Sequence, residues 1–264
     1  MNMKSLIKTL LRESLLNEKL RLKNWNEYAT LVANAYKEAP DFDNSVVGHW
    51  KALNASNHTL FKRLLSKVNV IFTTNDKSKV GGINIDGREF KIEYIKPDDE
   101  YKTQSEMKKS FQDTGVLKIS IDYSEHPIFS VADNIVFRTV HDYIVHILGN
   151  YNFGLEGEIG AYNRHAKLAP KEAVPAIFTE VVGQACVTIT HGGFPKQKIA
   201  LLRGFDYYNV GIVDNDNYII KDKTLVKKSE ADKEVPKKKS HEEPTAMKMP
   251  EPTLTERFRN KILK

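Results

Sequence analysis

One segment restricts the possible folds of this chain more than any other. The stretch EAVPAIFTEVVGQACVTIT, residues 172–190, is apolar around nearly its whole helical circumference, and a helix with that pattern lies buried inside a protein. Its polar exceptions Glu180, Gln184 and Thr188 are spaced i, i+4 and i+8, so they form one stripe. A buried glutamate needs a cation, a hydrogen-bond network or a proton. We therefore expect a buried helix with a polar site on one side.

Other helices are predicted around this one. Residues 134–148 and 155–169 have helical periodicity, and GNYNFG and Pro170 separate the three segments. Residues 26–67 also have a helical pattern, with turns near Pro40 and Asn44. Together these segments predict a helical bundle.

The periodicity changes between the two helical regions. The β-rich runs are VNVIFTT (68–74), GINI (82–85), REFKIEYI (88–95) and VLKISIDY (116–123). Asp86-Gly87 between two of them is a strong signal for a two-residue hairpin. The sequence predicts an α+β fold: a small antiparallel sheet of three or four strands, followed by a helical bundle that carries the polar site.

Helical extensions are expected at both ends of a core domain at 23–220. In residues 1–22, leucines and isoleucines at 6, 7, 10, 11, 15 and 16 form a helical stripe. Residues 221–252 are charged and predict a flexible linker. Residues 253–264 begin with a capping box, Thr253 and Glu256, and predict a short docking helix. Such helices dock onto the parent domain or onto a partner.

Composition narrows the chemistry. A chain of 264 residues with 41% apolar content can form one large core or two smaller ones. The single cysteine, Cys186, excludes an internal disulfide, so metal ligands would be His, Asp and Glu. Charged residues interrupt every apolar run near the N-terminus, and no segment approaches the roughly 20 apolar residues of a membrane span. We expect no membrane partner and a cytoplasmic location.

The helix at 134–148 carries two histidines and an aspartate. Asp142 and His146 are spaced i and i+4 and share one side of an α-helix. His141 and His146 are spaced i and i+5, which turns them about 140 degrees apart and departs from the metallopeptidase motif H-E-x-x-H. The spacing favours Asp142 with His146 as ligands and leaves His141 for orienting a ligand or for acid–base chemistry. A solvent-facing Asp142–His146 pair is the alternative.

The next two helices add acids and an imidazole. Glu158 and His165 lie two turns apart at the margin of an apolar face, where a structural hydrogen bond between them is the alternative to a site. Convergence of three helices predicts one polar pocket. Donors without thiolate fit zinc, manganese or iron(II). The predicted metal ligands are Asp142, His146, Glu158 and His165, and the predicted catalytic residues are His141, Glu180 and Gln184.

The segment VFRTVHDYIVH…LEGEIGAYNRH…FTEVVGQA…FPKQKIALL resembles an uncharacterised family of tailed-bacteriophage proteins. That family's pattern is V-H-D-x-x-x-H, G-E, a histidine, T-E-x-x-G-Q and Q-K-x-x-L-L. The resemblance covers residues 135–203 and departs at Val181-Val182 and Ala185-Cys186. It implies a phage origin and supplies no reaction. The matching positions are His141, Asp142, His146, Glu158, His165, Glu180, Gln184, Gln197 and Lys198.

Two functions are expected from these observations. The first is a phage metal-dependent hydrolase acting on nucleic acid or nucleotides, which the net charge of +6 weakly favours. Much of that charge lies in the lysine-rich tail, which is either a nucleic-acid contact or a simple tether. The second is a virion structural or assembly protein, whose polar cluster is structural and whose terminal helices dock onto other virion proteins. The expected location is the host cytoplasm, with incorporation into the virion under the second function.

Overall fold

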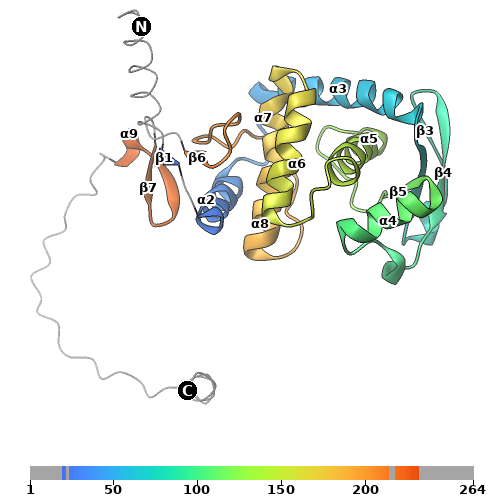
Figure 1. The fold of residues 1–264 in the computed structure, drawn as a ribbon. Helices are drawn as coiled ribbons and strands as arrows, with labels where there is room; N and C mark the ends of the chain where they lie inside the picture. Colours follow the sequence, from blue (N-terminus) through green and yellow to red (C-terminus); the bar gives the residue numbers. More distant parts are fainter. Residues whose placement is uncertain (1–19, 22–23, 214–217, 232–264) are drawn as a thin grey trace, which may run out of the picture. The chain divides into compact units, whose positions relative to one another are not determined.

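The computed structural model describes residues 20–21, 24–213 and 218–231 (Figure 1). All of these except Ala231 belong to one compact unit. The predicted C-terminal helix at 253–264, most of the predicted N-terminal helix and most of the predicted linker lie outside the described residues.

The central sheet has four strands: β2 (Asn69–Thr74), β3 (Gly81–Ile85), β4 (Arg88–Tyr94) and β5 (Val116–Ser120). Their order is β3-β4-β2-β5. β3 and β4 form the predicted antiparallel hairpin, in which Ile85 pairs with Arg88. Asp86 and Gly87 both have positive φ, 52° and 81°, as a type I′ turn requires.

The prediction that the whole sheet is antiparallel is wrong, because β2 pairs in parallel with both β4 and β5. β4 is parallel to β2 because the intervening strand β3 runs the other way and pairs with β4. The direction of β5 follows from α4 (Gln104–Thr114), a helix between β4 and β5 that is missing from the prediction. It begins with a capping box of Thr103 and Glu106 and ends at Gly115, whose φ is 69°. A helical crossover carries the chain back along the sheet, so β5 runs in the same direction as β4 and is parallel to β2 between them.

The helices surround the buried segment as expected, and the α+β fold class is confirmed. α2 (Trp25–Glu38) and α3 (Val47–Leu65) come first, and α5 (Val131–His141) and α6 (Leu155–Leu168) follow the sheet. The buried segment consists of α7 (Val174–Ile177), the π-helix η6 (Phe178–Gly183) and α8 (Gln184–His191). A second π-helix, η4 (Asp142–Ile147), continues α5. The 3-10 turns are η1 (Asn44–Val46), η2 (Lys77–Lys79), η3 (Pro97–Asp99) and η5 (Lys171–Ala173).

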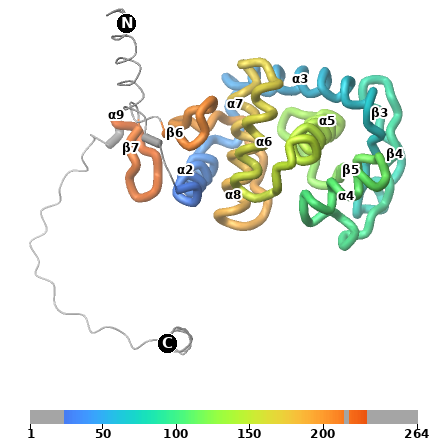
Figure 2. The backbone as a smooth tube through the Cα atoms, in the orientation of Figure 1, coloured from blue at the N-terminus to red at the C-terminus, as the bar shows by residue number. Residues whose placement is uncertain are grey.

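Two hydrophobic cores organise these elements. The first joins α2 and the start of α3 to α6, α7, η6 and α8, and includes Trp50, Tyr162 and Phe178. The second joins the end of α3 to the sheet and α5, and includes Phe72 and Val140. In the backbone trace, β3, β4, β5 and α4 lie together while α2 lies beside α8 (Figure 2). The chain thus builds two smaller cores.

Two predicted boundaries are corrected at the ends of the described region. Residues 20–21, predicted as the end of a helix, form β1 (Leu20–Arg21), which pairs with β6 (Ile212–Val213). The start of the predicted linker belongs to a hairpin of β7 (Tyr218–Lys221) and β8 (Thr224–Lys227), followed by α9 (Lys228–Ala231). Asp222 and Lys223 make the turn with positive φ. Each of these two short strands ends in a lysine, so the sequence pattern did not predict a hairpin here.

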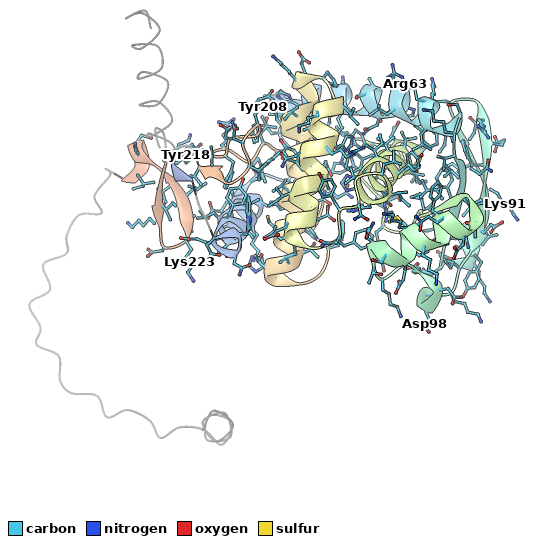
Figure 3. The ribbon with its side chains drawn as sticks, in the orientation of Figure 1. Arg63, Lys91, Asp98, Tyr208, Tyr218 and Lys223 are labelled. Carbon is cyan, nitrogen blue, oxygen red and sulfur yellow. The ribbon has the colours of Figure 1, made fainter. Side chains whose placement is uncertain are left out.

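The surface of the sheet region is charged. Arg63 of α3, Lys91 of β4 and Asp98 of η3 all point outward (Figure 3). One helix, Lys171–His191, is long and apolar enough to cross a membrane by length and composition, but 72% of its most apolar window is buried inside the protein. Buried core helices pass the same test, and this helix lies within the first core.

Candidate metal centre

His141 and His146 lie side by side because the helix changes its winding between them. Their ring centroids are 5.0 Å apart. An α-helix would separate residues five apart by about 140 degrees, but Asp142–Ile147 is a π-helix, with Leu148 N donating to Tyr143 O at 2.9 Å. The wider winding of a π-helix, with its i→i+5 hydrogen bonds, brings residues five apart closer to the same side. The prediction that His141 stands away from His146 is therefore wrong.

Asp142 completes a compact set of donors. One ligand atom from each of His141, Asp142 and His146 lies within 4.8 Å of the others. Both histidines are buried and Asp142 is half-buried. This group could hold a metal ion.

Glu158 of α6 faces both imidazoles. Its Oε2 lies 3.6 Å from His141 Nε2, and its Oε1 lies 3.6 Å from His146 Nε2. These distances are too long for hydrogen bonds. They are close to the roughly 3.4 Å that separates two donors bound to one tetrahedral ion at 2.0–2.1 Å. Glu158 thus lies against the group of His141, Asp142 and His146, with one oxygen near each imidazole.

The tautomer of His146 follows from its other ring nitrogen. Nδ1 lies 2.8 Å from the carbonyl oxygen of Tyr151. A carbonyl only accepts hydrogen bonds, so Nδ1 carries the proton and donates it. In neutral His146 the lone pair is then on Nε2, which faces Glu158. An Nδ1–H donated to a backbone carbonyl is the arrangement typical of a metal-binding imidazole.

The local electrostatics depend mainly on burial. Burial, followed by the nearby His141, lowers the pKa of His146. Burial also raises the pKa of the Asp142 carboxyl. Burial is also the largest single influence on the pKa of His141 and lowers it, but Glu158 and Asp142 together outweigh burial and leave that pKa above its ordinary value. Metal binding would relieve the cost of burying these groups together.

His165 lies next to the cluster rather than within the set of three close donors. Its ring centroid is 5.9 Å from that of His141, and Phe137 stacks on it at 5.7 Å. His165 Nε2 lies 3.0 Å from Asn57 Oδ1, and the residue is fully buried. Burial is the main reason that its pKa falls to about 3. His165 is therefore neutral, and its Nδ1 has no hydrogen-bond partner among the described residues.

Glu180 and Gln184 belong to a different network. The Glu180 carboxylate accepts from Trp50 Nε1 at 2.6 Å and from Gln184 Nε2 at 2.6 Å. His126 Nε2 lies 3.1 Å from it. His126 Nδ1 accepts from the backbone N–H of Phe129 at 2.9 Å, so in the neutral ring Nε2 is the donor to Glu180. The buried carboxylate thus has three donors.

This network corrects the predicted single pocket. Within the described residues, no hydrogen bond or ion pair links Glu180 or Gln184 to His141, His146 or Glu158. As the sequence indicated, the buried Glu180 carboxylate needs hydrogen-bond donors, and Trp50 and His126 are two of them. Glu180 and Gln184 thus belong to a buried hydrogen-bond network with Trp50 and His126, and their catalytic role stays a prediction.

Three residues of these networks could not be predicted from sequence patterns. Tyr151 acts through its backbone carbonyl, which no motif displays. His126 and Trp50 lie far along the chain from Glu180 and meet it only through the packing of α3 and the loop before α5. Lys198, which belongs to the phage-like pattern, donates to the carbonyl oxygens of Lys37 and Ala39 at the end of α2.

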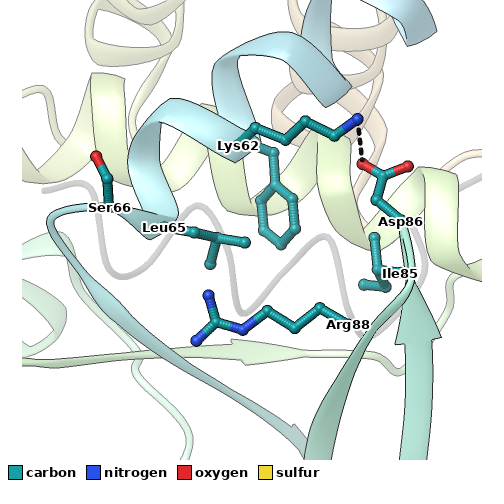
Figure 4. A pocket seen from close by; sticks show the side chains of 7 residues that line it. Lys62, Leu65, Ser66, Ile85, Asp86 and Arg88 are labelled. Atoms are coloured by element: carbon teal, nitrogen blue, oxygen red, sulfur yellow. Dashed lines mark ion pairs between the residues drawn. The ribbon is translucent and has the colours of Figure 1, made fainter.

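A surface pocket lies elsewhere and has about 280 Å³ of space (Figure 4). It opens between the end of α3 and the β3–β4 hairpin, where Lys62 Nζ is 3.6 Å from Asp86. None of the clustered histidines or acids lines it. Its lining residues are Phe61, Lys62, Leu65, Ser66, Ile85, Asp86 and Arg88.

The cluster lies where the two cores meet. η4 contributes Ile147 to the second core, and α6, which contacts η4, contributes Ile159 and Tyr162 to the first. Comparisons of this chain with protein-family models, with curated proteins and with solved structures find no match.

Proposed function

We propose that this chain is a metal-dependent hydrolase whose ion is held by His141, His146 and Glu158, with Asp142 beside them. The observation that carries the proposal is the placement of two imidazole Nε2 atoms at 3.6 Å from the two oxygens of one carboxylate. In neutral His146 the Nε2 is an acceptor, so it and the carboxylate need a cation or a proton between them.

The donor set narrows the ion and the chemistry. Two imidazoles with one or two carboxylates suit zinc, manganese or iron(II), and they leave positions open for water. A bound ion of this kind lowers the pKa of its water and supplies a nucleophile near neutral pH. The half-buried Asp142, next to both imidazoles, would hold the ion with them or take up a proton during the reaction. With a net charge of +6, phosphodiesters or nucleotides are the proposed substrates.

Metal content tests this proposal directly. We expect about one equivalent of zinc, manganese or iron in the purified protein, and loss of that ion in His146→Ala. His191→Ala is the matched control, because His191 is exposed at the end of α8 and should leave the metal content unchanged. Hydrolysis of a nitrophenyl phosphodiester should fall with the metal content. A folded wild-type protein that binds none of these ions would refute the proposal.

A second proposed function is a structural protein of a phage virion, in which the polar cluster holds two helices together without a metal. The raised pKa of His141 means that a proton there can neutralise Glu158 in place of a metal. The polar cluster would then be an ion pair between two helices. The same metal measurement separates the two functions: a metal-free wild type that unfolds more readily after His141→Ala supports the structural one. Deleting residues 232–264 and following incorporation into particles tests the docking role of the tail.

A further inference from the structure

The loop between η4 and α6 is held unusually close to α6. The stretch is GNYNFG, residues 149–154, and it contains Tyr151, whose carbonyl binds His146. Three glycines line the contact. A Cβ on Gly160 would lie 2.3 Å from a carbon of the Tyr151 ring, and a Cβ on Gly149 would lie 2.7 Å from the same ring. A Cβ on Gly157 would lie 2.0 Å from the backbone oxygen of Asn152. No side chain fits at these three positions as they stand.

These glycines have a geometric effect on the metal centre. Gly157 and Gly160 lie three residues apart on α6 and so share one face of the helix. Gly160 and Gly149 line a slot that holds the Tyr151 ring, and Gly157 leaves room for the backbone of Asn152. We call these three glycines the glycine slot. The ring of Tyr151 and the backbone of Asn152 are thus both held close against these glycines. In this arrangement the carbonyl oxygen of Tyr151 lies 2.8 Å from His146 Nδ1.

We infer that this glycine slot is a positioning device: by fixing Tyr151 it holds His146 with its proton on Nδ1 and its Nε2 free to bind a cation beside Glu158. The inference rests on the proposed metal-binding function of the cluster. Phe153 supports it, since its ring meets the His146 ring edge-on with centroids 4.7 Å apart. The slot and Phe153 together fix both the tautomer and the orientation of the imidazole.

The experiment uses the full chain with Gly160→Ala. The new methyl displaces the Tyr151 ring, so the carbonyl leaves His146 Nδ1. We expect zinc affinity, measured by calorimetric titration, to fall about 10- to 100-fold, the range seen when a group that orients a metal ligand is lost. Gly48→Ala in α3 is the matched control, because a Cβ there meets nothing within 4 Å. A second variant, Tyr151→Ala, empties the slot but keeps the carbonyl, and it should also weaken zinc binding.

A metal-free readout separates this inference from the proposed function. Imidazole ¹⁵N shifts report which nitrogen of His146 carries the proton. The wild type without metal should show Nδ1–H, and Gly160→Ala should show a mixture of tautomers. Unchanged zinc affinity together with an unchanged tautomer in Gly160→Ala would overturn the inference. A wild type that has the Nδ1–H tautomer but binds no zinc, manganese or iron would overturn the proposed function and leave the slot's role in setting the tautomer intact.

Discussion

Replacement of Glu180 by alanine should remove a large part of the stability of this protein. The substitution leaves three donors without their acceptor: Trp50 Nε1, His126 Nε2 and Gln184 Nε2. The side chains of His126 and Glu180 are only 1% and 4% exposed, so water replaces the acceptor poorly. Each unsatisfied buried donor costs about 1–3 kcal/mol. Because the three donors partly relax together, we expect a total loss of about 4 kcal/mol.

Urea unfolding followed by tryptophan fluorescence measures this loss. With a dependence on urea of about 2 kcal/mol per molar, a loss of about 4 kcal/mol lowers the midpoint by about 2 M. Glu180→Gln should cost less, because an amide oxygen still accepts from Trp50 and His126 while Gln184 can rotate its own amide. Glu172→Ala is the control, since that side chain is exposed in η5 and its loss should change stability by less than about 0.5 kcal/mol.

The result also tests the separation of the two polar networks. If Glu180 is structural, folded Glu180→Ala protein should keep the metal content of the wild type. A variant with nearly wild-type stability that has lost its metal would refute the reasoning and would return Glu180 to the metal centre.

Two further predictions concern other parts of the fold. Burial lowers the pKa of His58, but Asp86 and Asp133, at 2.9 and 2.8 Å, raise it above its ordinary value. The stability that this pairing contributes is complete below about pH 6.5 and is lost as pH rises through the pKa of His58 in the folded protein. His58→Gln should lack this pH-dependent contribution. If the melting temperatures of wild type and variant change in parallel from pH 6 to 9, the prediction is contradicted. Gly115→Ala should lower the free energy of unfolding by about 1 kcal/mol, because φ is 69° there, and equal urea midpoints for variant and wild type would show that the turn tolerates a side chain.

Local patterns in the sequence predicted most of the helices and strands. Asp86-Gly87 fixed the hairpin, and apolar periodicity located the three helices of the bundle. The direction of β5 depended on α4, whose start and end are set by capping residues at Thr103, Glu106 and Gly115. With only Met107 and Phe111 as large apolar residues, that helix has little periodicity to detect. The four strands were therefore predicted correctly, but the pairings of β2 with β4 and with β5 were predicted as antiparallel and are parallel.

The candidate site was predicted in its composition but not in its geometry. Polar residues in apolar segments identified His146 and Glu158, because burying such groups requires partners. The closeness of His141 to His146 depends on a π-helix, and a periodicity of 100 degrees per residue does not describe that winding. The sequence also indicated that Glu180 needs hydrogen-bond partners, because it lies in an apolar helix. Which residues became these partners depended on tertiary packing.

The two cores differ in how they can form while the chain is being synthesised. The second uses residues 61–147 only, so it can be completed before the ribosome has made the rest of the protein. The first joins α2 to residues as late as Val213. At roughly 5–20 residues per second, Tyr36 waits on the order of 10 to 30 s for Leu202 to emerge. During that interval the apolar face of α2 lacks its final neighbours, and this helix is the part of the nascent chain that most needs protection from aggregation.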